Sequence, residues 1–329
     1  MKNYPIAFVG CGNVSRMHFS GYLAHPERVT ITGGCDPSTE RQEHVTQQYG
    51  ISKTFSTLEE LVAQADWEVA IVCTPTPIRA PLIAQLSSAG KHIFVEKPMA
   101  DTLDEAKNMV DLCEQAGVSL AVDQNFRYFY PFSIARDLIQ EGALGNILSI
   151  THRNLTFRQD SGWRTQCARH ALSVMGVHWL DGFRWILGKE AATMFCQTTS
   201  SPAIDCVGDT DATVLITFPG GTTVSYEQSF SSQVRQTDTV IIGEEGTLFL
   251  DHEHVILYTK ISGQTPARQW DIPKENTRKP EATYQALDQF LTALEQGHEP
   301  ENSGRDNLNT IALLDAAYQS AETHRIVTL

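Results

Sequence analysis

The first 120 residues alternate between short, continuously apolar runs and longer segments that carry one polar face. The apolar runs predict strands over 6–9, 29–35, 69–73, 92–95 and 119–122. The amphipathic segments predict helices over 14–23, 39–49, 57–65, 80–89 and 103–116. Thr57, with Glu60 three residues later, forms a capping-box pattern at the start of the third helix. Strands without alternation that are separated by helices indicate a parallel sheet covered on both faces.

The hydrophobic pattern changes after about residue 123. It predicts helices over 132–141, 168–187, 283–296 and 307–324, and strands over 147–157, 213–218, 222–230, 239–242 and 247–250. Pro219-Gly220-Gly221 joins two alternating strands, which is a hairpin signal. These patterns favour an antiparallel-rich sheet layered on helices. Since 329 residues fit two cores, we predict domains over 1–122 and 123–329, with a last helix that can pack back on the first.

Composition narrows the partners that the chain can have. A net charge of −14 argues against a nucleic-acid partner, because phosphates would be repelled. The start of the chain is unlike a secretory signal, and no apolar run approaches the ~18 residues of a membrane span. The 7 cysteines lack a C-x-x-C spacing and suit small buried hydrophobes in a reducing compartment. We therefore expect a cytoplasmic protein with no membrane partner and no metal site.

A glycine-rich segment, Gly10-Cys11-Gly12-Asn13-Val14-Ser15, lies between the first predicted strand and the first predicted helix. Gly10 permits a tight turn, Gly12 lets a pyrophosphate approach the backbone, and Ser15 is small enough to pack helix on strand. The segment therefore predicts dinucleotide binding by a Rossmann-type sheet.

Asp36 ends the second predicted strand, where a carboxylate accepts hydrogen bonds from ribose hydroxyls. The alternative is a turn residue ahead of Pro37. An acid at this position repels a 2′-phosphate, so NAD is favoured over NADP, while Arg41 keeps NADP open.

Glu96-Lys97-Pro98 directly follows the fourth main strand. Ligands of doubly wound sheets bind off the carboxyl ends of the strands, so these side chains are expected to point toward the cofactor. A partly desolvated lysine near nicotinamide should have a lowered pKa, which suits proton transfer near neutral pH. The alternative is an ordinary surface lysine after a strand.

Longer segments follow the glycine loop in a fixed order: CTPTPIRAPLIAQLSSAGKHIFVEKPMA, FRYFYP, GVHWLDGFRWILG and LLDAAYQSAETHRIVTL. Together they resemble the Gfo/Idh/MocA family (glucose–fructose oxidoreductase, inositol dehydrogenase, rhizopine catabolism) over essentially the whole chain. The resemblance implies an α/β fold, with an N-terminal Rossmann domain and a C-terminal α+β domain. The second domain would hold a large, mostly antiparallel open sheet, which often mediates homodimers or homotetramers.

The resemblance also implies Lys97 as the proton-transfer residue of an NAD(P)-dependent dehydrogenase or reductase that acts on CH–OH groups. With the glycine loop and Asp36, the candidate cofactor-binding residues are Gly10, Gly12, Asn13, Val14, Asp36, Thr74, Pro75, Thr76, Glu96, Lys97, Gln124, Trp163 and Arg164. Trp163-Arg164 resembles a family pair that often reaches the nicotinamide or the substrate; Trp163 could instead be a core aromatic.

His170, Val174 and His178 are spaced i, i+4 and i+8 in the predicted helix 168–187 and should share one face. Many family members have Asp-x-Gly-x-His here, so valine replaces the acid in this chain. His178 matches the family histidine and is the second candidate catalytic residue; the alternative is a core imidazole. His170 could substitute for the lost acid. Asp181 could orient the ring of His178 or end the polar face.

Arg79 occupies a position where family members commonly carry histidine. It could pair with a cofactor phosphate or an anionic substrate group, or be a solvated residue at a helix start. Gln124, Arg127 and Tyr128, with Tyr130, follow the last strand of the parallel sheet. There they could contact cofactor or substrate, or pack between domains.

The leading hypothesis is hydride transfer between nicotinamide and a secondary hydroxyl or ketone of a sugar or cyclitol. Lys97 would take the hydroxyl proton, and His178 would hydrogen-bond the same oxygen. One alternative is an NAD-dependent glycosidase that acts by oxidation and elimination. The other is a non-catalytic NAD-binding regulator, which the loss of the acid at Val174 favours and the retention of Lys97 and His178 opposes.

Overall fold

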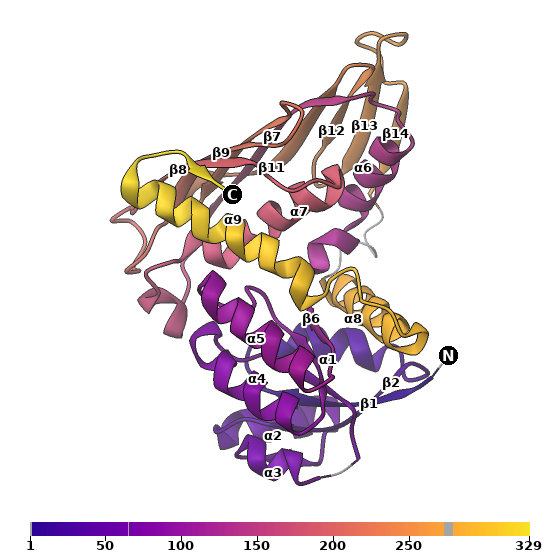
Figure 1. Cartoon of the computed structure of the whole chain (residues 1–329), viewed down its shortest axis with the longest axis vertical. Coiled ribbons are helices and arrows are strands. Elements are labelled where there is room, and N and C mark those ends of the chain that lie inside the picture. The colour runs from indigo at the N-terminus through magenta and orange to yellow at the C-terminus, as the bar shows by residue number, and fades with distance from the viewer. Residues whose placement is uncertain (1, 65, 273–278) are drawn as a thin grey trace. The chain divides into compact units, whose positions relative to one another are not determined.

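The computed structural model describes residues 2–64, 66–272 and 279–329 and divides into two compact units (Figure 1). Unit 1 comprises Met1–Tyr128 and Arg278–Ile311, and unit 2 comprises Phe129–Thr277 and Ala312–Leu329. Each unit is therefore assembled from two stretches of chain. The division into cofactor and substrate domains at residue 122 stays a prediction.

Unit 1 is built on a parallel sheet with the strand order β3-β2-β1-β4-β5-β6. Its strands are β1 (Tyr4–Val9), β2 (Val29–Cys35), β3 (Thr54–Phe55), β4 (Val69–Val72), β5 (His92–Val95) and β6 (Leu120–Val122). Its helices include α1 (Ser15–Leu23), α2 (Thr39–Tyr49), α3 (Leu58–Val62), α4 (Arg79–Ser88), α5 (Leu103–Gln115) and α8 (Lys279–Gln296). This order is that of a doubly wound dinucleotide-binding sheet, as predicted.

Helices cover both faces of this sheet. Neighbouring residues of β1 point in opposite directions, so Ala7 and Val9 pack with α3, α4 and α5, whereas Ile6 and Phe8 pack with α1, α2 and α8. The predicted capping box of Thr57 and Glu60 is present at α3. Residue 65, which the predicted helix 57–65 includes, lies outside the described residues.

Helix α8, from the far end of the sequence, completes unit 1. Arg28 is fully buried and donates hydrogen bonds to Asp288 (2.5 Å) and Thr292 (3.1 Å) of α8, and it also pairs with Glu295. The backbones of α1 and α8 approach so closely that a Cβ at Gly21 would lie 2.3 Å from the carbonyl oxygen of Pro280. A small residue is therefore required at this crossing.

Unit 2 contains a sheet with the order β14-β13-β12-β11-β7-β10-β9-β8-β15, in which the only parallel pair among the described strands is β7 with β10. The strands are β7 (Ile147–Phe157), β8 (Thr193–Thr199), β9 (Asp211–Thr217), β10 (Thr223–Ser229), β11 (Ser231–Gly243), β12 (Gly246–Leu250), β13 (His254–Thr259), β14 (Arg268–Asp271) and β15 (Val327–Thr328). The predicted large, mostly antiparallel sheet is confirmed. Strands β8, β13, β14 and β15 were not predicted.

Helices pack on one face of this sheet. They are α6 (Tyr130–Gln140), α7 (Val177–Leu187) and the later turns of α9 (Gly304–Thr323). The ring of His152 on β7 lies 4.1 Å from that of Trp179 on α7, and Ser320 on α9 hydrogen-bonds the backbone N–H of Cys196 on β8. Buried and exposed residues alternate along β9 and β10, as expected for a sheet with one covered face.

The predicted start of the helix 168–187 is wrong. The helix begins at residue 171, and Leu172–Gly176 form a π-helical turn before α7. Asp209 explains this start, because its carboxylate accepts hydrogen bonds from the backbone N–H groups of His170 (2.7 Å) and Leu172 (3.0 Å). A residue distant in sequence thus takes the role of a helix cap, which the local pattern could not indicate.

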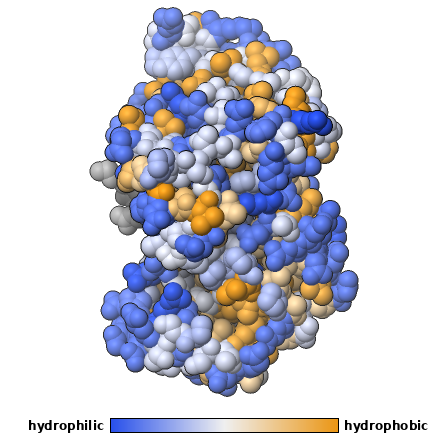
Figure 2. All heavy atoms as spheres, turned by 90° about the vertical axis from the view of Figure 1, so that its left-hand side faces the viewer, coloured by the Kyte–Doolittle hydropathy of each residue, from blue (hydrophilic) through white to orange (hydrophobic). Residues whose placement is uncertain are grey.

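None of the helices in the described part of the chain combines the length and the apolar character that a membrane span requires. The face drawn in Figure 2 is mostly hydrophilic, and its hydrophobic residues form separate groups.

Substitution Gly21→Ala should lower the free energy of unfolding by about 1–3 kcal/mol, because the added methyl group meets a backbone oxygen that cannot rotate away. Denaturant unfolding would measure this loss. Ser20→Ala, on the exposed side of the same helix, is the matched control and should be neutral or slightly stabilising. A Gly21→Ala protein as stable as the control would contradict the close approach of α1 and α8.

Candidate active site

The glycine loop has the geometry that a dinucleotide needs. Gly10 has φ of +93°, and a Cβ there would lie 3.0 Å from both Cys73 C and Thr74 Cγ2. Only glycine fits this position without strain. Val14, the N-cap residue of α1, has a hydrocarbon side chain, so the first amides of the helix receive no cap from it. The N–H groups of Ser15 and Met17 donate to the carbonyls of Gly12 and Val14 (3.2 Å each), so a phosphate would be held by the other amides of this turn.

Asp36 is buried beside this loop. One carboxylate oxygen accepts a hydrogen bond from the N–H of Cys11 (2.9 Å), and the other accepts one from the N–H of Ser38 (2.9 Å). The Nη1 atom of Arg41 lies 3.4 Å from the carboxylate. Asp36 therefore stabilises both the turn that follows β2 and the glycine loop. Its role as a turn residue does not exclude a hydrogen bond with a ribose hydroxyl.

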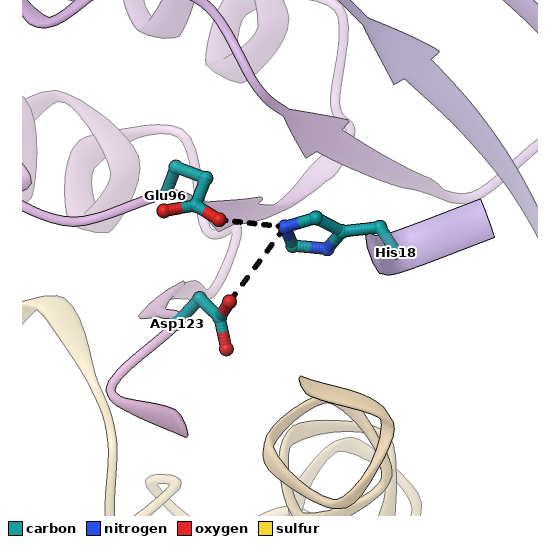
Figure 3. Close-up of side chains that lie close together, drawn as sticks. All are labelled: His18, Glu96 and Asp123. Atoms are coloured by element: carbon teal, nitrogen blue, oxygen red, sulfur yellow. Dashed lines mark hydrogen bonds and ion pairs between the residues drawn. The ribbon is translucent and has the colours of Figure 1, made fainter. Parts of the chain in front are cut away.

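A buried group of three side chains lies at the carboxyl ends of β5 and β6 (Figure 3). His18 of α1 places Nε2 2.8 Å from Glu96 Oε1 and 3.6 Å from Asp123 Oδ2, and its Nδ1 lies 2.8 Å from the hydroxyl of Tyr22. The sequence placed Glu96 toward the cofactor and gave no role to His18 or Asp123. The signal for His18 was its i, i+4 spacing to Tyr22 on one helix face.

The two carboxylates of this group differ in proton affinity. Burial, followed by the charge of Glu96, raises the pKa of Asp123 well above its usual range. Burial also opposes ionisation of Glu96, but the hydrogen bond from His18 and the charges of His18 and Lys97 hold the pKa of Glu96 below its usual value. The two shifts run in opposite directions, so Asp123 holds its proton to a higher pH than Glu96 does. The charge of Lys97 favours the ionised form of both carboxyl groups.

Arg79 is buried, with 3% of its surface exposed, so the alternative of a solvated residue is wrong. Its Nε and Nη2 atoms donate to the carbonyl of Thr74 (3.0 and 2.8 Å), and its Nη1 atom donates to the carbonyls of Glu96 and Pro98. The guanidinium therefore joins the segment after β4 to the residues on both sides of Lys97. Lys97 itself is half-buried.

Several buried polar atoms near these strand ends have no hydrogen-bond partner among the described residues. They are Thr74 Oγ1, Asp123 Oδ1, and both Gln124 Oε1 and Gln124 Nε2. Buried polar groups are normally satisfied, so these atoms point to a ligand. A free amide donor and acceptor on Gln124 match the carboxamide of a nicotinamide. With the cradle at Gly10, the residues present fit a nicotinamide dinucleotide.

The remaining cofactor candidates of unit 1 are distributed around the same loops. Asn13 is exposed and Val14 is half-buried, while Thr76 is buried at the start of the 3-10 turn Thr76–Ile78, directly after Pro75. Contacts of these residues with the cofactor stay predictions.

Arg127 lies on the 3-10 turn Asn125–Tyr128 and is 2% exposed. It donates hydrogen bonds to the carbonyl of Glu301 (2.8 Å) and to Asp306 Oδ2 (2.6 Å), both within unit 1. These contacts stabilise the unit, and substrate contact by Arg127 or Tyr128 stays a prediction. The side chain of Tyr130 lies outside the described residues.

In unit 2, His178 is buried on α7, and Asp181 lies 3.6 Å from Arg184 one turn later. Trp163 and Arg164 lie on the 3-10 turn Gly162–Gln166, with the guanidinium 5.0 Å from the Trp163 ring centroid. Trp163 is 36% exposed, so the core-aromatic alternative is wrong. The roles of these residues stay predictions.

A role for His170 in place of the lost acid stays a prediction. His170 lies before the helix and is fully buried, with Nε2 3.1 Å from Asp160 Oδ2 and Nδ1 3.3 Å from the carbonyl of Asp209. Both ring nitrogens are therefore occupied within unit 2. The π-helical turn also changes the spacing between Val174 and His178, so the argument for one common face does not apply.

Comparison with known proteins adds independent findings. A family model described as "Oxidoreductase family, NAD-binding Rossmann fold" matches residues 4–124, and a GFO/IDH/MocA C-terminal domain model matches residues 132–249. The chain is 29% identical to a D-apiose dehydrogenase of Paraburkholderia graminis, over 100% of this chain and 90% of that protein. It is 25% identical to an inositol 2-dehydrogenase of Rhizobium meliloti, over 98% of each.

A solved structure shares the fold. An oxidoreductase from Agrobacterium radiobacter, in complex with NAD+, L-tartaric acid and magnesium, matches with a TM-score of 0.90 at 24% identity, over 99% of this chain and 98% of that chain.

Asp160 should make stability depend on pH. Burial opposes its ionisation, but hydrogen bonds from His170 and Arg158 lower the pKa of Asp160 to about 2. Because the folded pKa lies below the unfolded one, this stabilisation is complete above about pH 4 and is lost as pH falls through about 2. We expect Asp160→Asn to lower the free energy of unfolding by about 2 kcal/mol at pH 7 and by progressively less toward pH 2, as measured by denaturant unfolding.

Asp205→Asn, which alters an exposed acid of the same unit, is the control. Its free energy of unfolding should equal that of the parent protein at every pH. If the loss of unfolding free energy in Asp160→Asn stayed constant from pH 7 to pH 2, an ionised Asp160 could not be the source of this stabilisation.

Proposed function

Because the chain belongs to the Gfo/Idh/MocA family of oxidoreductases, whose N-terminal domain is an NAD-binding Rossmann fold, we propose that it transfers a hydride between NAD and a secondary hydroxyl or ketone of a sugar or cyclitol. The observation that carries the proposal is the placement of Lys97. It lies two residues after the end of β5, and its charge acts on both Glu96 and Asp123 at the carboxyl edge of the sheet. Relatives named D-apiose dehydrogenase and inositol 2-dehydrogenase support the substrate class.

The role of Lys97 is proton transfer. A bound nicotinamide supplies the hydride acceptor for oxidation and the hydride donor for reduction. Neutral Lys97 accepts the hydroxyl proton through Nζ while the carbon–oxygen double bond forms, and the protonated ammonium returns it in the reverse direction. A positioned general base of this kind contributes roughly 10²- to 10⁴-fold to the rate.

The buried neighbours of Lys97 suit this role. The pKa of Glu96 is held below its usual value, so Glu96 supplies a negative charge that stabilises the ammonium form after the proton has been taken, whereas the raised pKa of Asp123 makes that carboxyl group harder to ionise. The catalytic role of His178 and the assembly into homodimers or homotetramers stay predictions.

Lys97→Met should reduce kcat by roughly 10²- to 10⁴-fold and leave NAD affinity within a few-fold of the parent, because the base is lost and the glycine loop is unchanged. Absorbance of NADH over a panel of aldoses, inositols and their keto forms measures turnover, and calorimetry measures NAD binding. Lys107→Met, on an exposed position of α5, should retain full activity.

Parent-like turnover by the Lys97→Met enzyme would exclude the proposed proton transfer. Release of a chromogenic aglycone by the parent without accumulation of NADH would favour the glycosidase alternative.

We also propose that Asp36 selects NAD over NADP. The carboxylate lies beside the glycine loop and would repel a 2′-phosphate, while the Arg41 guanidinium lies near both Asp36 and Gly12. Asp36→Asn keeps the acceptor for the N–H of Cys11 but removes the charge. It should raise the ratio of kcat/KM for NADP to that for NAD by about 10-fold, equivalent to about 1.4 kcal/mol.

Adding Arg41→Ala to Asp36→Asn should reverse most of this gain, because the guanidinium is then no longer available to the phosphate. An unchanged cofactor ratio in Asp36→Asn would show that selection lies elsewhere.

A further inference from the structure

The guanidinium of Arg79 holds the main chain on both sides of Lys97. Its Nη1 atom donates to the carbonyl of Glu96, directly before the lysine, and to the carbonyl of Pro98, directly after it. Its Nε and Nη2 atoms both donate to the carbonyl of Thr74, at 3.0 and 2.8 Å. One side chain thus joins the segments that follow β4 and β5.

Arginine is the side chain that can make this set of contacts. The guanidinium is planar and presents its donors in a fixed fork, so carbonyls on two segments are held at a defined separation. The ammonium of a lysine is a point with three donors on a flexible stem and cannot reproduce that fork. The contacts therefore define a geometry as well as a charge.

The residue before Lys97 is also fixed through its side chain. Glu96 accepts a hydrogen bond from His18 Nε2 (2.8 Å), and both His18 and Glu96 are buried. Glu96 is thus held at its carbonyl by α4 and at its carboxylate by α1. The backbone that carries the lysine has little freedom to move at this end.

The burial of Arg79 calls for a reason beyond packing. A guanidinium that is 3% exposed has lost its hydration, and an apolar side chain would fill the same space without that cost. The hydrogen bonds to three carbonyls recover part of the cost. Two of the three carbonyls, those of Glu96 and Pro98, belong to the segment to which the proposed function assigns a reacting side chain.

We propose that Arg79 is a positioning residue for Lys97, which holds the Glu96–Pro98 segment so that Lys97 Nζ meets the substrate hydroxyl in a reactive geometry. This inference rests on the proposed function of Lys97. Displacement of a reacting group by about 1 Å can cost about 100-fold in rate, so the hold is expected to control kcat rather than cofactor binding.

The test compares Arg79→Lys, which keeps the charge but loses the fork, with Arg79→Met, which loses both. We expect kcat to fall by about 10- to 100-fold in both variants, with NAD affinity within about twofold of the parent. The solvent deuterium isotope effect on kcat should rise, because proton transfer by a misplaced lysine becomes slower. Amide hydrogen exchange at Lys97 and Met99 should accelerate, because the carbonyls around them are released.

Arg28→Lys is the matched control. Arg28 is also a fully buried arginine of unit 1 that binds carboxylates and a backbone carbonyl, but its partners lie in α8 and at Lys2. It should lose stability as Arg79→Lys does, and should keep the parent kcat and isotope effect. If Arg79→Met does not fold, Arg79→Lys and Arg79→His supply the same measurements.

Two results would overturn the inference. One is a parent-like kcat in Arg79→Lys despite accelerated exchange at Lys97 and Met99, and the other is unchanged exchange at those amides. Either result leaves the proposed function intact if Lys97→Met is inactive. An active Lys97→Met enzyme would instead remove the proposed function, while the exchange data would still report whether Arg79 holds the segment.

Discussion

Burial of the Glu96 carboxylate against His18 is the interaction on which the candidate site depends. A charged group in the interior is tolerated only when it is hydrogen-bonded and its charge is offset, and Glu96 meets both conditions through His18, Lys97 and Arg79. Because the sheet is parallel, the carboxyl ends of β5 and β6 meet at one edge, and α1 adds its histidine there. The fold thereby places Lys97 beside two buried carboxyl groups whose pKa values are shifted in opposite directions.

The polar atoms at this edge fall into two groups. Glu96, His18 and Arg79 are paired with other groups of the protein and form a fixed framework. Thr74 and Gln124 have buried polar atoms without a partner among the described residues. Buried polar groups are costly when they lack a hydrogen-bond partner. The paired side chains therefore position the segment that carries Lys97, and the polar atoms without a partner are the ones that a bound cofactor would satisfy.

Unit 2 shows how a single acid can define a helix start far from itself in sequence. Asp209 binds the N–H groups of His170 and Leu172 and also accepts a hydrogen bond from Tyr318 of α9. The first turn of the helix is thereby anchored to the segment before β9 and to α9. His170 becomes part of this anchor, with its ring nitrogens against Asp160 and the carbonyl of Asp209.

The sequence by itself determined the parallel sheet of unit 1, the glycine turn and the cap at Thr57, because each follows from local periodicity or from the backbone needs of a few neighbouring residues. It also pointed to Lys97 by position after a strand. Only the tertiary structure decided the roles of His18, Arg79 and Asp209, because their partners lie on other elements. Helix α8 packs on unit 1 through its own apolar residues, such as Leu287 and Phe290, but its close approach to α1 and its ion pairs depend on Gly21 and Arg28, which lie outside the helix.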